Sequence, residues 1–157
     1  VEIDGQMWVY YMGGNGQHTN FRESSLGRAY WEADKFACWT EKNEGMESIL
    51  TTTTLTLGGN YIEVLADEAD AEKDWELMAS VHPGWTENAY EGLGMEDAVT
   101  EKSGRWIRIS WKGKKLPDKS GCIRFQFKNL KIWAVRGELE YKGHRLWEGA
   151  DMENEGM

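Results

Sequence analysis

The feature that most constrains the fold is a series of short runs in which apolar and polar residues alternate. These runs cover residues 6–12, 27–31, 36–40, 50–57, 61–66, 75–82, 106–111, 122–128 and 131–135. Alternation with a period of two is typical of β-strands, and the Gly-, Asn- and Asp-bearing breaks between the runs are typical of turns. A helix is expected only around residues 87–99. The series predicts an all-β fold, a two-sheet antiparallel β-sandwich of the jelly-roll, concanavalin-like type.

The chain has 157 residues, which is the length of one ordinary domain. We expect a single sandwich domain over residues 1–147 and an acidic, flexible tail over residues 148–157. The formal net charge of -9 disfavours nucleic acids and anionic membranes as partners, because the field of the protein repels polyanions. No apolar run approaches the length of a membrane span, so no membrane association is expected.

The sequence does not decide whether the chain contains a disulfide bond or binds a structural calcium ion. Cys38 and Cys122 show no metal-binding spacing, and the sequence does not decide whether they form a disulfide. The acidic run 67–74 offers oxygen ligands, but Trp75 stands where an EF-hand loop requires its turn glycine. We expect no cofactor, and the sequence leaves a structural calcium ion open.

Nine tryptophans imply either an aromatic core or exposed platforms for flat ligands, of which sugars are the commonest. Strand parity sorts them, because alternate side chains face opposite sides of a sheet. In the run 106–111, Ile107, Ile109 and Trp111 are expected in the core, which leaves Trp106 and Arg108 on the outer face. Trp75 and Trp133 are likewise expected to be buried.

The same parity in runs 75–82 and 122–128 presents further polar residues outward, and the turn-rich stretch after Pro83 carries two more aromatic side chains. An ordinary solvated sheet would show a similar surface. The candidate ligand-binding residues are Trp106, Arg108, Arg124, Gln126, Glu76, His82, Trp85 and Tyr90.

If the strands on either side of residues 112–120 pair as a hairpin, Arg108, Arg124 and Lys128 share one face. Guanidinium groups suit carboxylates and sulfates, so a uronate or sulfated polysaccharide is a ligand hypothesis. The alternative is that these cations only neutralise neighbouring acidic residues.

An ordered series of segments resembles the C-terminal β-sandwich module of propeller glycosidases related to glycoside hydrolase family 32 and to sialidases. The series comprises residues 8–18 (WVYYMGGNGQH), 26–36 (LGRAYWEADKF), 50–52, 83–85, 109–113 (ISWKG) and 121–135 (GCIRFQFKNLKIWAV). In that family the first two segments lead from the propeller into the sandwich. The nucleophile and acid/base segments of the catalytic propeller are missing from this chain. The resemblance therefore implies the sandwich and a link to glycans, not hydrolysis.

The sequence thus predicts a secreted, lectin-like, non-catalytic carbohydrate-binding module that recognises a polysaccharide or oligosaccharide through exposed Trp and Arg side chains. One alternative is a structural sandwich that packs on the propeller catalytic domain of a longer parent protein. A second is a glycoside hydrolase or polysaccharide lyase with unrecognised carboxylates. The glycan and the oligomeric state are not specified by the sequence.

Overall fold

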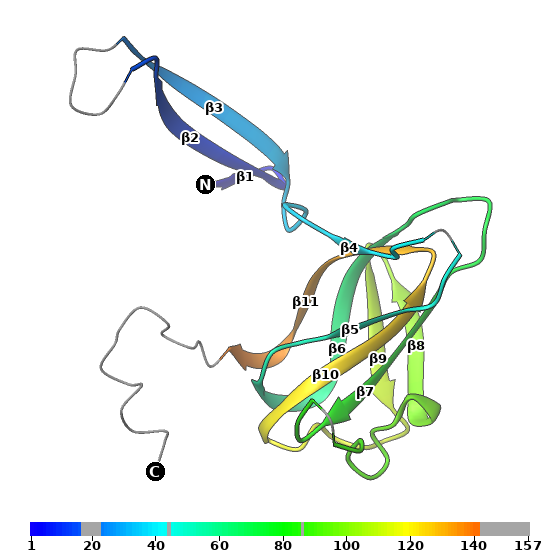
Figure 1. Ribbon diagram of the computed structural model, residues 1–157. Coiled ribbons are helices and arrows are strands. Elements are labelled where there is room, and N and C mark those ends of the chain that lie inside the picture. The colour runs from blue at the N-terminus through cyan, green and yellow to red at the C-terminus, as the bar shows by residue number, and fades with distance from the viewer. Residues whose placement is uncertain (17–22, 44, 86, 142–157) are drawn as a thin grey trace.

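A computed structural model describes residues 1–16, 23–43, 45–85 and 87–141. The tail predicted for residues 148–157 lies outside the described residues. The elements are β1 (Glu2–Ile3), β2 (Gln6–Gly14), β3 (Ser24–Glu32), β4 (Trp39–Thr40), β5 (Ser48–Thr51), β6 (Leu55–Glu68), β7 (Glu76–His82), the short 3-10 helix η1 (Met95–Asp97), β8 (Ala98–Ser103), β9 (Trp106–Trp111), β10 (Lys119–Lys128) and β11 (Leu130–Tyr141) (Figure 1).

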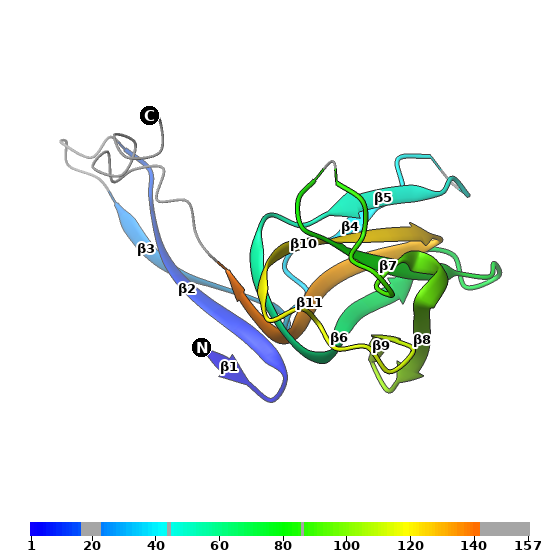
Figure 2. The same cartoon turned by 90° about the horizontal axis from the view of Figure 1, so that it is seen from below.

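The eight strands from β4 to β11 form one antiparallel sheet that folds into two layers (Figure 2). The larger layer has the order β4-β11-β6-β9-β8, and the smaller layer has the order β5-β10-β7. Strand β10 joins them, because Lys119–Gly121 pairs with β6 before the rest of the strand pairs with β7. The predicted all-β sandwich is confirmed.

The pairing is nested along the chain, as in a jelly roll. Strand β4 pairs with β11, β5 with β10, and β6 with β9. Strands β7 and β8 lie side by side, since the Thr100 hydroxyl donates a hydrogen bond to the carbonyl of Leu77 at 2.9 Å. Because β4 pairs with β11, the first and last strands of the sandwich are neighbours.

The hydrophobic core lies between the two layers. Parity places Ile107, Ile109 and Trp111 there, as predicted, opposite the β7 and β10 side chains of the smaller layer. The indole N–H of Trp111 crosses between the layers and donates to the carbonyl of Ala79 at 3.1 Å. Trp75 packs at the edge of this core and is only partly buried.

Residues before β4 form a separate three-stranded sheet with the order β1-β2-β3, here called the N-terminal sheet. It extends away from the sandwich and approaches it only at one end (Figure 1). The prediction of one sandwich domain over residues 1–147 did not anticipate this second sheet.

Most predicted strands are present, and the run 106–111 coincides with β9. The prediction of a helix around residues 87–99 is wrong, because that stretch holds only the short 3-10 helix η1 and the first residues of β8. The predicted strand 50–57 is divided by residues 52–54, which join β5 of one layer to β6 of the other. Within the described ranges, no helix is long and apolar enough to cross a membrane.

Candidate functional site

The predicted ligand-binding residues fall into two groups on opposite layers of the sandwich. Strand β9 pairs with β6 and β8, and β10 pairs with β5 and β7. The predicted hairpin between β9 and β10 is therefore wrong. Arg108 lies on the outer face of the larger layer, whereas Arg124 and Lys128 lie on the smaller one. These three cations do not form one anion-binding face.

Trp106 is the main correction to the sequence prediction. It shares the outer face of β9 with Arg108, as parity requires, but only 8% of its surface is exposed. The guanidinium carbon of Arg136, from β11, lies 3.9 Å from the centroid of its ring. Leu65, opposite Trp106 on β6, is completely buried on the same face. Trp106 is packed against its neighbours and offers no open platform to a sugar.

The prediction that His82 lies at the outer surface is also wrong. Strand β7 turns its side chain away from the core, but the loop after β7 folds back over it. His82 Nδ1 lies 2.8 Å from the carbonyl oxygen of Glu87, and Nε2 lies 2.7 Å from the hydroxyl of Ser80. Both ring nitrogens bond within the protein, so His82 is not available to a ligand.

Trp85 and its neighbours form the outer surface of the smaller layer. Trp85 is exposed over 61% of its surface, as its loop position predicts. The guanidinium of Arg124 donates a hydrogen bond to the main-chain carbonyl of Trp85 and so fixes the loop to β10. Gln126, two residues further along β10, donates to the carboxylate of Glu47 at 2.8 Å.

Two further predicted residues lie at the borders of this surface. Glu76 is exposed, and its carboxylate is 3.9 Å from the ammonium of Lys128. Tyr90 is half-buried: its hydroxyl donates to the carbonyl of Ser120 at 3.3 Å, and the ammonium of Lys119 lies 4.6 Å from its ring centroid. Arg124, Gln126, Glu76 and Trp85 are thus on the outer side of the smaller layer, whereas Tyr90 packs against the hydrophobic core.

Arg108 belongs to a polar cluster that sequence reasoning missed. Arg136, Glu63 and Arg108 form one row across β11, β6 and β9. Arg108 Nη2 donates to Glu63 Oε1 at 3.0 Å, and Arg136 Nε donates to Glu63 Oε2 at 2.8 Å. The Arg108 guanidinium also lies 4.2 Å from the ring centroid of Tyr61.

Glu63 is held as a carboxylate by this row. Its hydrogen bond from Arg108 lowers its pKa below the ordinary value of 4.5; burial opposes this effect, and the Arg136 bond reinforces it. A carboxyl group that must donate a proton as a general acid needs the opposite shift. Glu63 is therefore suited to binding cations and hydroxyl groups rather than to acid catalysis.

The N-terminal sheet carries an apolar surface on each face, which sequence reasoning also missed. Strands β2 and β3 pair from Gln6 and Glu32 at the end near the sandwich to Gly14 and Ser24 at the far end. Trp8 stacks on Tyr30 at a centroid distance of 4.6 Å. Alternation along the two strands gives one face the apolar side chains Trp8, Tyr10, Met12, Leu26 and Tyr30, and the other face Met7, Val9, Tyr11, Ala29 and Trp31. The first face also carries Arg28, whose guanidinium carbon lies 5.1 Å from the centroid of the Trp8 ring.

Tyr11 has a close neighbour across the two strands. It lies opposite Gly27, and a Cβ atom on Gly27 would stand 2.6 Å from Tyr11 Cζ. The ring of Tyr11 therefore covers the glycine backbone.

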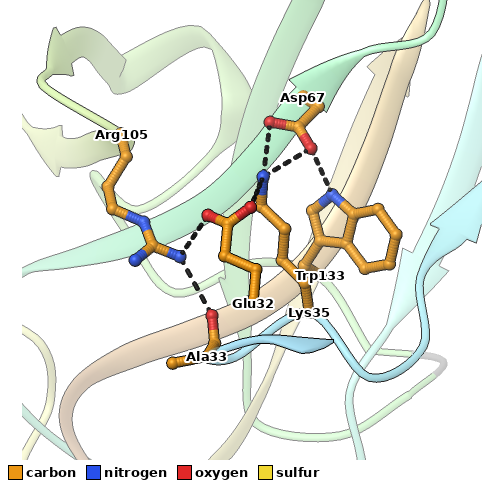
Figure 3. Close-up of polar contacts among 6 residues, drawn as sticks. All are labelled: Glu32, Ala33, Lys35, Asp67, Arg105 and Trp133. Carbon is orange, nitrogen blue, oxygen red and sulfur yellow. Dashed lines mark hydrogen bonds and ion pairs between the residues drawn. The ribbon is translucent and has the colours of Figure 1, made fainter. Parts of the chain in front are cut away.

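A cluster of ion pairs, here called the joint, connects the N-terminal sheet to the sandwich (Figure 3). Lys35 Nζ lies 2.8 Å from Asp67 Oδ2 and 3.0 Å from Glu32 Oε2. Arg105 Nη2 donates to the carbonyl of Ala33 at 3.0 Å and lies 3.1 Å from Glu32 Oε1. The joint thus fixes the end of β3 to β6 and to the start of β9.

Trp133 completes the joint, since its indole N–H donates to Asp67 Oδ2 at 2.8 Å. It is half-buried rather than a core residue, which corrects the prediction. Burial alone would raise the pKa of Asp67, but the hydrogen bonds from Lys35 and Trp133 outweigh this effect and lower it. Likewise, burial lowers the pKa of Lys35, but its bonds to Asp67 and Glu32 leave it above 10.5. Both groups stay charged at neutral pH.

Both cysteines are free thiols. Burial raises the pKa of the Cys122 thiol, which therefore remains protonated and unreactive at neutral pH. In the part of the chain that the structure describes, no group of three His, Cys, Asp or Glu side chains could hold a metal ion.

Comparisons with known protein families, with curated proteins and with solved structures found no match to this chain.

Proposed function

We propose that the chain is a non-catalytic, structural β-sandwich module that packs through its N-terminal sheet against an adjoining β-sheet domain. The observation that carries this proposal is the exposure of large apolar side chains on both faces of that sheet. Tyr10, Leu26 and Tyr30 are exposed on one face, and Val9 and Tyr11 on the other. Contiguous apolar surface of this kind marks interaction sites.

The sequence of β2 supports the same conclusion. Residues 7–12 form an uninterrupted apolar run, MWVYYM, so the alternation predicted over residues 6–12 is wrong there. Such a run is typical of a strand covered on both faces. An isolated hairpin is at best marginally stable in water, so further structure on both faces would stabilise this one.

The edge of β3 also favours a β-sheet as the partner. The N–H of Asn15 donates to the carbonyl of Glu23, its opposite residue, at 3.2 Å. Asn15 and Glu23 are therefore a hydrogen-bonded pair, and in an antiparallel ladder hydrogen-bonded and non-hydrogen-bonded pairs alternate. The N–H and C=O groups of the non-hydrogen-bonded residues of β3 point away from β2; these residues are Ser24, Leu26, Arg28 and Tyr30. Within the described ranges no strand pairs with this edge, and an added strand would satisfy these groups.

The joint supports a docking role because it fixes the direction in which the N-terminal sheet projects. A preformed surface loses less conformational freedom on binding than a flexible one. A pocket of about 400 Å³ lies beside the joint and is lined by Met7, Trp31, Asp34, Phe36, Ala37 and Trp133. It continues one apolar face of the N-terminal sheet and would admit a side chain of the docked domain.

The resemblance of residues 8–36 to the junction between a propeller and a sandwich agrees with a β-sheet domain as the partner. It is the reason for preferring an adjoining propeller-like domain to an unrelated fold. A non-catalytic role follows the same resemblance, and hydrolysis or lysis of glycans stays an untested alternative.

Hydrogen exchange on the isolated chain tests the proposal. We expect amides of β2 and β3 to exchange orders of magnitude faster than those of β6 and β9, because the sheet lacks its partner layers. The chain should also bind an apolar dye, and replacing both Tyr10 and Leu26 with Thr should reduce that binding. Ile49→Thr is the matched control, since Ile49 is exposed on the smaller layer. Equal protection of both regions, without dye binding, would show that the sheet needs no partner.

Polysaccharide binding at the outer surface of the smaller layer is a second candidate function, favoured by the exposure of Trp85 beside Arg124. An exposed indole stacks on a pyranose ring while guanidinium groups bond to hydroxyl, carboxylate or sulfate groups. Titration with neutral, uronate and sulfated polysaccharides should shift the tryptophan fluorescence, and Trp85→Ala should abolish that shift. Trp39→Ala is the control, because Trp39 is equally exposed on the larger layer. An extracellular location stays a prediction.

A further inference from the structure

The pairing of β6 with β11 contains an irregularity that opens a pocket on the larger layer. Gly137 pairs with Ile62, but the next residue, Glu138, pairs with Gly58. Residues 59–61 are therefore extra residues in β6, and together with β11 they line a pocket of about 310 Å³. Bulges of this kind often redirect side chains at functional sites.

The pocket combines an aromatic ring with both donors and acceptors of hydrogen bonds. Its lining residues are Gly59, Asn60, Tyr61, Glu63, Arg136, Gly137 and Glu138. Asn60 can donate and accept, Arg136 donates, and Glu138 accepts. A polyhydroxyl ring needs this mixture, because each hydroxyl group is both donor and acceptor.

The charges in and around the pocket balance. Two guanidinium groups, Arg108 and Arg136, stand beside two carboxylates, Glu63 and Glu138. Glu63 is bonded to both arginines, so the pocket offers no excess of either charge. This balance favours a neutral ligand over a uronate, a sulfate or a cation.

The pocket is held in shape by the surrounding structure. Gly59 has φ +81, and its carbonyl accepts a hydrogen bond from the N–H of Leu116 at 2.9 Å. The guanidinium of Arg108 lies against the ring of Tyr61 and fixes one of its faces. A site that is already formed loses little freedom when it binds a small ligand.

We infer that this pocket, here called the bulge pocket, binds a single neutral hexopyranose ring through Asn60, Tyr61, Arg136 and Glu138. The volume lies at the lower end of the range for small-molecule pockets, which suits one ring rather than a chain of sugars. The inference is independent of docking by the N-terminal sheet, and it concerns a different layer from Trp85.

The test is an NMR titration of the whole chain with D-glucose, D-galactose and D-mannose in turn. We expect at least one sugar to bind and to shift the amide signals of residues 58–63 and 136–138. Glu138→Gln should weaken that binding roughly tenfold, the loss expected for one hydrogen bond to a charged group. Asn60→Ala should also weaken it. Glu140→Gln is the matched control, because Glu140 lies on the same strand outside the pocket.

The outcomes separate this inference from the proposals above. Absence of binding for all three sugars overturns the inference, as does binding that Glu138→Gln and Asn60→Ala leave unchanged. Binding that Trp85→Ala abolishes would also overturn it and would place sugar recognition on the smaller layer. None of these results affects the docking proposal, which hydrogen exchange and dye binding test separately. Unchanged melting temperatures of the variants would show that lost binding does not reflect unfolding.

Discussion

The guanidinium carbon of Arg136 lies 3.9 Å from the ring centroid of Trp106, although 30 residues separate them in the chain. The contact joins β11 to β9 across the intervening β6. The Arg136 side chain covers the outward-facing ring of Trp106, so that Trp106 is buried. Arg136 also donates a hydrogen bond to the carboxylate of Glu63. The outer face of the larger layer is therefore partly a packed surface.

Replacing Trp106 with Ala should destabilise the fold, because the substitution leaves a cavity beneath Arg136. We expect a loss of about 3 kcal/mol in the free energy of unfolding. Trp85→Ala should change it by less than about 0.5 kcal/mol, since that side chain is mostly exposed. Urea unfolding of both variants measures the difference, and equal losses would contradict the burial of Trp106.

Gly121→Ala should be strongly destabilising for a reason that no strand pattern reveals. A Cβ atom at this position would lie 2.6 Å from the carbonyl oxygen of His82 and 2.9 Å from Leu57 Cδ1. The first contact is with backbone, which cannot move aside without breaking the pairing of β7 and β10. We expect a loss of about 2 kcal/mol, measured by thermal unfolding. Gly104→Ala provides a contrast, because it would add strain from its φ of +63 but meets no neighbouring atom.

Lys35→Met should loosen the N-terminal sheet without unfolding the sandwich. The substitution removes the bonds to Asp67 and Glu32 and leaves the strands of the sandwich intact. We expect faster hydrogen exchange at the amides of Trp31 and Ala33, which bond to the chain segment opposite β3, and a change of about 1 kcal/mol or less in global stability. Lys128→Met, which removes only the pair with Glu76, should leave that exchange unchanged. Equal hydrogen exchange in both variants would show that the ion pairs of the joint do not hold the N-terminal sheet in place.

Stability should fall in acid through Glu63. Its pKa is lower in the folded state than its ordinary value of 4.5, so the unfolded state binds a proton first as the pH falls. The stabilisation is complete above the ordinary value and is lost as the pH falls through the folded value. Urea unfolding at a series of pH values should show wild type more stable than Glu63→Gln at neutral pH, with the difference shrinking in acid. A difference independent of pH would be inconsistent with ionised Glu63 between two arginines.

Strand parity predicted the direction of side chains well. Ile107, Ile109 and Trp111 point into the core, and Arg108 points out, because the period of a strand is fixed by its backbone. Parity does not show what lies over the outward face. Trp106 is covered by a residue from β11 and His82 by its own following loop, and neither arrangement is visible in the local sequence.

Two features of the fold, strand β8 and the pairing of β9 with β6, have no signal in the local sequence, whereas the apolar character of β2 does. Strand β8 escaped prediction because it is an edge strand whose two faces are both largely polar. The pairing of β9 with β6 depends on residues more than 40 positions apart, so adjacency along the chain wrongly favoured β10. In contrast, the unbroken apolar run 7–12 is visible in the sequence, but it was interpreted as an alternating strand rather than as one buried on both faces.

The nested pairing of the sandwich has a consequence for synthesis on the ribosome. The N-terminal sheet is made of neighbouring segments, so it can form as soon as residue 32 has emerged. The larger layer cannot close until β11 has been made, because β11 lies between β4 and β6. About 100 residues therefore emerge while the aromatic hairpin stands without a finished sandwich behind it. The apolar surface of the N-terminal sheet is therefore exposed for longer during synthesis than the core of the sandwich is.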